Sequence, residues 1–102
     1  MGRAKCGAHC GMAVIERDVE QHFIWRIAMM GGLTWKTKAI GRVGFPDQTA
    51  LLPGEIWLVE LKRPKGRLAE AQKQFAADCA RLKVRYACLW SIEMIDAWAK
   101  AL

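Results

Sequence analysis

Apolar and polar positions change period along the chain, and each change marks a predicted element. From residue 15 to residue 30 the apolar side chains recur every three or four positions, which predicts an amphipathic helix that ends at Gly31-Gly32. The apolar stripe consists of Val19, Phe23, Ile24, Ile27 and Met30. Glu16 and Glu20 fall on the same side of the helix as this stripe. A carboxylate that points toward a core needs a reason.

A strand pattern follows at residues 33–38, where apolar and polar side chains alternate. The alternation predicts a half-buried strand with Leu33, Trp35 and Thr37 on one face. We expect Trp35, Trp57 and Trp90 to lie in the core rather than to serve as platforms for stacked bases.

The middle of the chain has the pattern of a hairpin. Residues 49–52 and 56–62 form two apolar runs, and Pro53-Gly54 between them is a strong turn signal. The second run is typical of a strand that is covered on both faces. Glu60 in its interior is therefore anomalous.

The last third of the chain alternates helix and strand. Helical spacing returns at residues 68–82, where Gln72 interrupts the apolar stripe. Residues 85–90 read as a strand, and Ser91 opens a final helix that runs to Ala101. The predicted order is αβββαβα, an α/β fold in which helices flank a mixed sheet.

Length and composition limit the interpretation further. The chain has 102 residues, 53% of them hydrophobic and 25% charged, as expected for one globular domain. We expect residues 1–12 to form a loose leader and residues 13–102 a single domain. The uncharged stretch of residues 27–35 is too short to cross a bilayer, and no apolar signal segment is apparent. We therefore expect a cytoplasmic protein.

The leader contains three residue types that bind zinc, namely Cys6, His9 and Cys10. A structural zinc site needs four ligands, and the remaining candidates lie in predicted core elements. With no export signal, we expect the thiols to be reduced. The role of this cluster stays open.

The formal net charge of +6 has a location in the sequence. The segment from residue 62 to residue 85 contains eight basic and two acidic residues, so it carries the whole excess. Such a segment attracts polyanions such as DNA, although a solvated helix face would account for part of it. Our candidate DNA-binding residues are Lys65, Arg67 and Lys73.

Three polar residues of the hairpin are candidates for chemistry. Glu60 and Lys62 are two positions apart on one strand, so their side chains share a face. Asp47 lies on the other arm of the hairpin, near the end away from Pro53-Gly54, and can converge with them. A surface ion pair is the simpler explanation for Glu60 and Lys62, but this strand is too apolar for it.

Two carboxylates and an ammonium group suit a hard divalent cation and a phosphate ester. A cation held by Asp47 and Glu60 would place a water molecule and lower its pKa. Lys62 would neutralise charge on the phosphoryl oxygens, and it is also able to orient or deprotonate the water. The pattern thus predicts phosphodiester hydrolysis.

These motifs resemble a known family. Phe45-Pro46-Asp47 and Glu60-Leu61-Lys62 resemble the PD-(D/E)xK signature of restriction-endonuclease-like nucleases. The wider set is similar to the VRR-NUC (virus-type replication-repair nuclease) domain in its stand-alone phage form, over about residues 15–98. The wider set consists of Gly44-x-Pro46-Asp47, Leu51-Leu52-Pro53-Gly54, Val59-Glu60-Leu61-Lys62, Gly66-Arg67-Leu68 and Gln72.

The resemblance implies roles for individual residues. Metal ligands would be Asp47, Glu60 and the backbone carbonyl of Leu61. Lys62 would be catalytic, and Gln72 would reach the site from the second helix. Family members also use a glutamate of the first helix. Glu20 fits that spacing better than Glu16, and both stay open.

The resemblance also implies an activity, namely a Mg²⁺- or Mn²⁺-dependent DNA endonuclease. Such an enzyme would cut branched DNA as a homodimer, like the Holliday-junction resolvases, in the host-cell cytoplasm if it is phage-encoded. Candidate interface residues are Trp25, Met29, Met30 and Trp98. The alternative is a basic DNA-binding module without catalysis, in which Glu60 and Lys62 form a structural pair.

Overall fold

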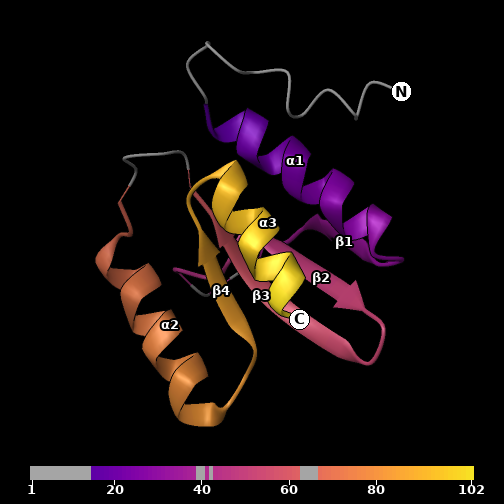
Figure 1. Cartoon of the computed structure of the whole chain (residues 1–102). Helices are drawn as coiled ribbons and strands as arrows, with labels where there is room; N and C mark the ends of the chain where they lie inside the picture. The colour runs from indigo at the N-terminus through magenta and orange to yellow at the C-terminus, as the bar shows by residue number, and fades with distance from the viewer. Residues whose placement is uncertain (1–14, 39–40, 42, 63–66) are drawn as a thin grey trace.

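A four-stranded mixed sheet with helices on both faces forms the body of the protein (Figure 1). The computed structural model describes residues 15–38, 41, 43–62 and 67–102. The elements, in chain order, are α1 (Glu16–Met29), β1 (Leu33–Lys36), β2 (Gln48–Leu52), β3 (Glu55–Leu61), α2 (Glu70–Leu82), β4 (Tyr86–Leu89) and α3 (Ile92–Ala101). The predicted order αβββαβα and the α/β fold class are confirmed.

The strands lie in the order β1-β2-β3-β4. β1 pairs with β2 and β2 with β3 in antiparallel fashion, whereas β3 and β4 are parallel. Pro53-Gly54 forms the two-residue turn between β2 and β3, with Gly54 at φ +77°. A glycine is favoured there because side chains resist positive φ. The predicted hairpin is thus confirmed.

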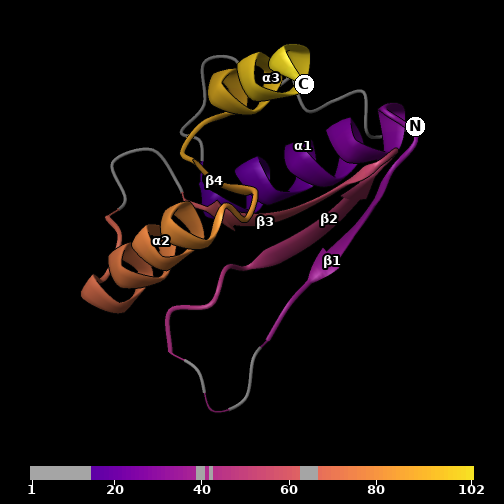
Figure 2. The same cartoon turned by 90° about the horizontal axis from the view of Figure 1, so that it is seen from below.

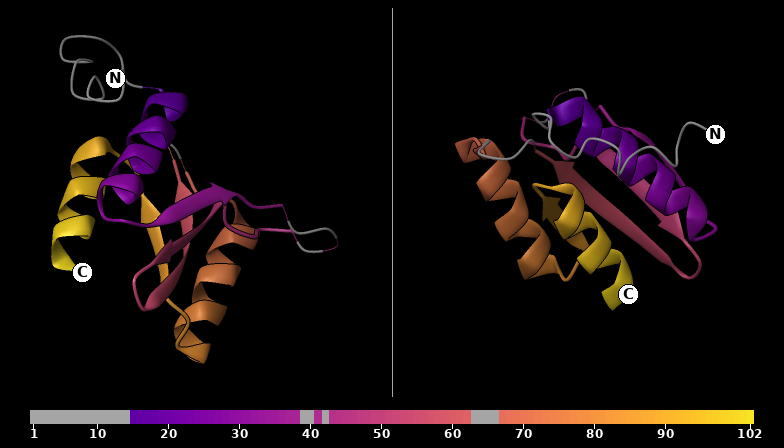
Figure 3. Two further views of the ribbon diagram at one scale, coloured as in Figure 1. Left: turned by 90° about the vertical axis from the view of Figure 1, so that its right-hand side faces the viewer. Right: turned by 45° about the horizontal axis from the view of Figure 1, so that its top comes forward.

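The helices divide between the two faces of the sheet. α1 and α3 lie side by side on one face, and α2 lies on the other face along β4 (Figures 2 and 3). No helix of the described part covers β1 and β2 on the α2 side (Figure 2). On that face of the sheet, β4 therefore packs against α2, whereas β1 and β2 are not covered by any described helix.

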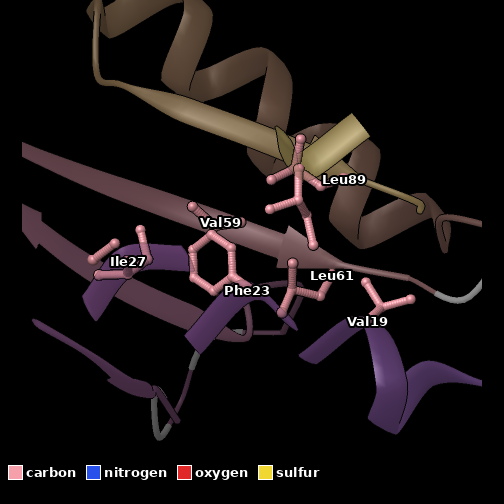
Figure 4. Close-up of a cluster of buried hydrophobic side chains, with 8 residues drawn as sticks. Val19, Phe23, Ile27, Val59, Leu61 and Leu89 are labelled. Atoms are coloured by element: carbon pink, nitrogen blue, oxygen red, sulfur yellow. The ribbon is translucent and has the colours of Figure 1, made fainter. Parts of the chain in front are cut away.

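The core lies between α1, α3 and the sheet. The buried side chains Val19, Phe23 and Ile27 form one stripe of α1 and pack toward Val59 and Leu61 of β3 (Figure 4). This stripe is the predicted one, except that Ile24 faces solvent. Burial of a side chain as large as Phe23 stabilises the fold by about 3 kcal/mol.

The first strand corrects two predictions. Leu33 and Trp35 are 66% and 48% exposed, so the predicted face of this strand does not reach the core. Thr34 instead faces α1, where its hydroxyl contacts the buried Gln48. The alternation at residues 33–38 predicted the wrong buried face because α2 covers only the half of the sheet near β4. Ile56, 58% exposed, shows the same effect on β3, which is fully buried only from Val59 onward.

Two other tryptophans behave as predicted or nearly so. Trp57 packs edge-on against Trp98, with ring centroids 5.4 Å apart, beside the core cluster. Trp90 is half-buried. Trp98 also lies 5.8 Å from the ring of Phe23. Trp98 therefore packs against the core of its own chain.

None of the helices in the described ranges is long and apolar enough to span a membrane.

Candidate active site

The hairpin register places the two predicted carboxylates opposite each other. Gln48 pairs with Val59, so the preceding residue Asp47 lies across from Glu60, at the end of the hairpin away from its turn. The Asp47 carbonyl accepts a hydrogen bond of 2.7 Å from the Thr37 N–H. Asp47 Oδ2 accepts another, of 3.3 Å, from the Leu61 N–H. The predicted convergence of Asp47 with Glu60 is observed.

Glu60 is the most deeply buried carboxylate of the site, with 1% of its surface exposed. The Gln72 amide donates to Glu60 Oε2 over 2.9 Å, and the Lys62 ammonium lies 3.7 Å from the same oxygen. The other oxygen, Oε1, is buried and meets no hydrogen-bond donor among the described residues. Glu60 therefore keeps one coordination position that protein atoms leave unfilled.

Electrostatics indicate which kind of ion would suit this arrangement. Burial and the negative charge of Asp47 raise the pKa of Glu60 to about 7, a net value that includes the opposing effect of Lys62. An ionised Asp47 and an ionised Glu60 repel each other in a site from which water is largely excluded. A divalent cation between them would remove that repulsion and satisfy the orphaned Oε1. The residues present therefore fit a metal ion.

The donor set would leave such an ion open to substrate. Within the described ranges, no three His, Cys, Asp or Glu side chains are grouped closely enough to enclose a metal. Two carboxylates and the carbonyl of Leu61 would supply only part of the six or more oxygen ligands that Mg²⁺ or Ca²⁺ takes. Cys88, the register partner of Glu60, is an unsuitable ligand because burial raises the pKa of its thiol to about 11.

Gln72 also caps a helix, a role that the sequence analysis did not assign to it. Its Oε1 accepts a hydrogen bond of 2.7 Å from the Ala69 N–H, which caps the first turn of α2, while its Nε2 reaches Glu60. The sequence signal was a glutamine at the third position of the helix, where a capping side chain is expected. The same side chain thus anchors α2 and orients Glu60.

The segment before Asp47 is fixed against α2 by close packing. Gly44 has φ +88°, and a Cβ atom there would lie 2.4 Å from the carbonyl oxygen of Ala71. The rings of Phe45 and Phe75 meet edge to face at a centroid distance of 5.1 Å. Sequence reasoning had not identified these contacts, because they join residues about 30 positions apart. They determine where Asp47 enters the site.

A carboxylate of α1, Glu20, lies near Asp47, although it is not grouped closely with both Asp47 and Glu60. Glu20 and Asp47 line a small pocket of about 60 Å³ together with Lys36, Gln48 and Leu61. Glu20 Oε2 accepts a hydrogen bond of 3.1 Å from the Gln48 amide and lies 3.5 Å from the Lys36 ammonium. The structure thus places Glu20 beside Asp47. The side chain of Glu16 lies outside the part that the structure describes.

The basic residues of the predicted DNA-binding segment divide into two groups. Arg67 and Lys73 are exposed, and no ion pair engages either of them within the described ranges. Arg81 and Arg85 instead lie 3.3 Å and 3.6 Å from the carboxylates of Asp78 and Glu55. Fewer basic residues of this segment are therefore available to bind DNA than its net charge implied. Lys65 and the cluster of Cys6, His9 and Cys10 lie outside the described residues.

Comparisons with known proteins agree with this geometry. No family model matches the chain. A solved structure described as a VRR_NUC domain superposes with a TM-score of 0.79 and 26% identity, over 83% of this chain and 94% of that one. A curated phage protein, "Putative nuclease p44" of Acyrthosiphon pisum secondary endosymbiont phage 1, is 38% identical over 55 residues.

The phage match covers 52% of this chain and 59% of that relative, so it spans little more than half of the relative's length. The solved VRR_NUC domain, in contrast, is matched over nearly its whole length. It has the same restriction-endonuclease-like architecture as this chain. The structural similarity, the sequence similarity and the motifs at residues 44–62 point to the same family. The chain has the fold of a VRR-NUC domain, and the resemblance predicted from the motifs is confirmed.

Proposed function

We propose that this chain is a metal-dependent endonuclease that hydrolyses phosphodiesters in branched DNA, with Mg²⁺ or Mn²⁺ as cofactor. One observation carries the proposal: the buried Glu60, with an orphaned oxygen, lies opposite Asp47 and beside the ammonium of Lys62. Carboxylates repel phosphate unless a cation lies between them. A pure DNA-binding module would gain nothing from this pair.

Each residue has a task in the proposed reaction. A metal bound at Asp47, Glu60 and the Leu61 carbonyl would activate a water molecule and polarise the phosphoryl group. Lys62 is placed to offset the charge that grows on the phosphoryl oxygens, and its ammonium group can donate a hydrogen bond that orients the attacking water. Gln72 keeps Glu60 in the orientation that the metal requires.

The substrate class rests on charge and on resemblance. Arg67 and Lys73, with Lys65 beyond the described residues, are assigned to backbone phosphates, which attract any DNA regardless of sequence. No element of the described part is free to read base edges, because each helix packs on the sheet. Selectivity for DNA shape, such as a four-way junction, is therefore favoured over selectivity for sequence.

We further propose that the enzyme works as a homodimer. Leu33, Leu51 and Ile56 are register partners across β1, β2 and β3, so they form a continuous apolar row on the uncovered sheet face. The exposed ring of Trp35 extends the row. We place the interface here rather than on α1 and α3, where Met30 and Trp98 pack against the core. A two-fold dimer would present one site to each of two strands of a junction.

The test of catalysis is the nicking of supercoiled plasmid with Mg²⁺ or Mn²⁺ and with EDTA. We expect nicking only with metal, and loss of nicking in the Asp47→Asn, Glu60→Gln and Lys62→Ala variants. Glu93→Gln, which alters an exposed carboxylate on α3, is the matched control and should cut normally. Plasmid binding without nicking would favour the non-catalytic module, and activity in EDTA would refute metal dependence.

The test of assembly is light scattering together with cleavage of a synthetic four-way junction. We expect a dimer and paired cuts from the wild type, and a monomer with single cuts from Ile56→Lys. Met29→Lys changes an equally exposed apolar residue on α1 and should stay dimeric. A wild-type monomer that prefers flaps would refute the dimeric resolvase and leave the metal-nuclease site intact.

A further inference from the structure

Gln48 is a buried amide beside the proposed metal site, and no motif or similarity assigns it a role. It follows Asp47 directly and occupies the first position of β2, with 1% of its surface exposed. Successive strand residues point to opposite faces. Asp47 therefore lies opposite Glu60 on the α2 side, while Gln48 points toward α1 and meets Glu20. Because Asp47 and Gln48 are adjacent in the chain, the positions of Glu60 and Glu20 are both tied to the start of β2.

The hydrogen bonds of Gln48 fix the orientation of Glu20. The Gln48 Nε2 donates to Glu20 Oε2 over 3.1 Å, and the Thr34 hydroxyl lies 3.0 Å from Gln48 Oε1. The same hydroxyl is 2.9 Å from the Thr49 carbonyl, so Thr34 is itself held by the sheet. Glu20 is thus tied through one amide to two strands. Lys36 contacts the same Glu20 oxygen but is 75% exposed, so its hold is weak.

Both contacts engage Glu20 Oε2, and Oε1 has no hydrogen-bond partner among the described residues. That oxygen belongs to the side chain that lines the pocket shared with Asp47. Burying an amide inside a sheet is costly unless its hydrogen bonds are satisfied, and an apolar residue would serve packing better. The amide at this position is explained if it directs Glu20.

We propose that Gln48 is a positioning residue, which holds Glu20 Oε2 so that the carboxylate adds its charge to the metal-binding pocket. The inference rests on the proposed nuclease function. Residues that orient metal ligands without touching the metal contribute about 10- to 100-fold in metal affinity or activity. Removing the amide should therefore weaken Mn²⁺ binding and turnover without unfolding the protein.

The experiment combines direct Mn²⁺ binding with kinetics. The free Mn²⁺ signal in electron paramagnetic resonance measures binding in the absence of DNA, and plasmid nicking separates kcat from KM. Gln48→Met keeps the volume and removes the amide, and Thr34→Val removes the hydroxyl that faces it. Gln74→Met, on the exposed surface of α2, is the matched control. Thermal unfolding reports whether each variant is folded.

We expect Gln48→Met to weaken Mn²⁺ binding and lower kcat by about 10-fold or more, with KM for DNA unchanged. Thr34→Val should shift both in the same direction by less. A double-mutant cycle adds the decisive readout: in a Glu20→Gln background, Gln48→Met should have no further effect. A merely structural glutamine would lower the melting temperature and give additive effects.

The inference would be overturned if the folded Gln48→Met variant binds Mn²⁺ and turns over DNA as well as the wild type does. Additive effects of Gln48→Met and Glu20→Gln would also overturn it. If Gln48→Met does not fold, the cycle of Thr34→Val with Glu20→Gln decides in the same way. A wild type that neither binds Mn²⁺ nor nicks DNA would overturn the proposed function itself, and this inference with it. Failure of the Gln48 inference and failure of the proposed function can be told apart, because only the latter would be seen in the unmodified protein.

Discussion

The buried Glu60 predicts an opposition between stability and activity in the metal-free protein. Replacing it with glutamine keeps the shape of the side chain and removes its charge. The amide oxygen of the new residue can still accept the hydrogen bond from Gln72, while the repulsion from Asp47 and the cost of burying a carboxylate disappear. We expect Glu60→Gln to be inactive and yet more stable than the wild type in EDTA.

The magnitude follows from the pKa of Glu60. Burial and Asp47 raise it from 4.5 to about 7, a value that already includes the attraction of Lys62. The folded state therefore binds a proton between pH 4.5 and pH 7 that the unfolded state has released, so stability falls as the pH rises through this window. Above the window the loss is on the order of 3 kcal/mol, since the pKa rises by about 2.5 units and one unit equals about 1.4 kcal/mol.

The assay is urea unfolding in EDTA at pH 5 and at pH 8. We expect nearly equal stability of the two proteins at pH 5. At pH 8, we expect Glu60→Gln to be more stable by roughly 3 kcal/mol. Glu93→Gln, with its exposed carboxylate, should change stability by no more than about 0.5 kcal/mol at either pH. Saturating Mn²⁺ should stabilise the wild type and leave Glu60→Gln unchanged.

One result would refute this reasoning. If Glu60→Gln is equally stable or less stable than the wild type at pH 8 in EDTA, while the control behaves as expected, the carboxylate carries no burial penalty. Glu60 would then be satisfied by contacts within the protein. The argument that its unfilled oxygen calls for a cation would fall with it.

Three further outcomes are expected. Lys62→Ala should lower kcat by at least about 100-fold with little change in Mn²⁺ affinity, and a parallel loss of both would reassign the lysine to metal-site assembly. Charge reversal at Arg67 or Lys73 should flatten the dependence of DNA affinity on salt, measured by fluorescence anisotropy with Lys62→Ala; unchanged slopes would place the DNA surface elsewhere. Gly44→Ala should cost about 2 kcal/mol or more in urea unfolding, because its Cβ would meet a carbonyl at 2.4 Å, and an unchanged midpoint would contradict that close contact.

The sequence was most informative where spacing alone decides the outcome. Helical and strand periods predicted the element order, and the two-residue spacing of Glu60 and Lys62 with the turn at Pro53-Gly54 predicted their meeting with Asp47. Gln72 was identified because it interrupts an apolar stripe. In each case the local rule of strand or helix geometry suffices.

The remaining features depend on contacts between distant parts of the chain. Trp35 was expected in the core, but its exposure depends on which part of the sheet α2 covers, and no local pattern contains that information. Gln48 reads as an ordinary polar residue at a strand edge until α1 brings Glu20 against it. The packing of Gly44 on Ala71 likewise joins segments that the sequence separates.

The double hydrogen bonding of Gln72 has a consequence for local unfolding. Because one amide group caps α2 at Ala69 and holds Glu60, fraying of the first helical turn and loss of the site geometry are a single event. Amide hydrogen exchange at Ala69 would therefore report on the integrity of the site. A ligand that fixes Glu60 would slow that exchange, although it touches no atom of the helix backbone.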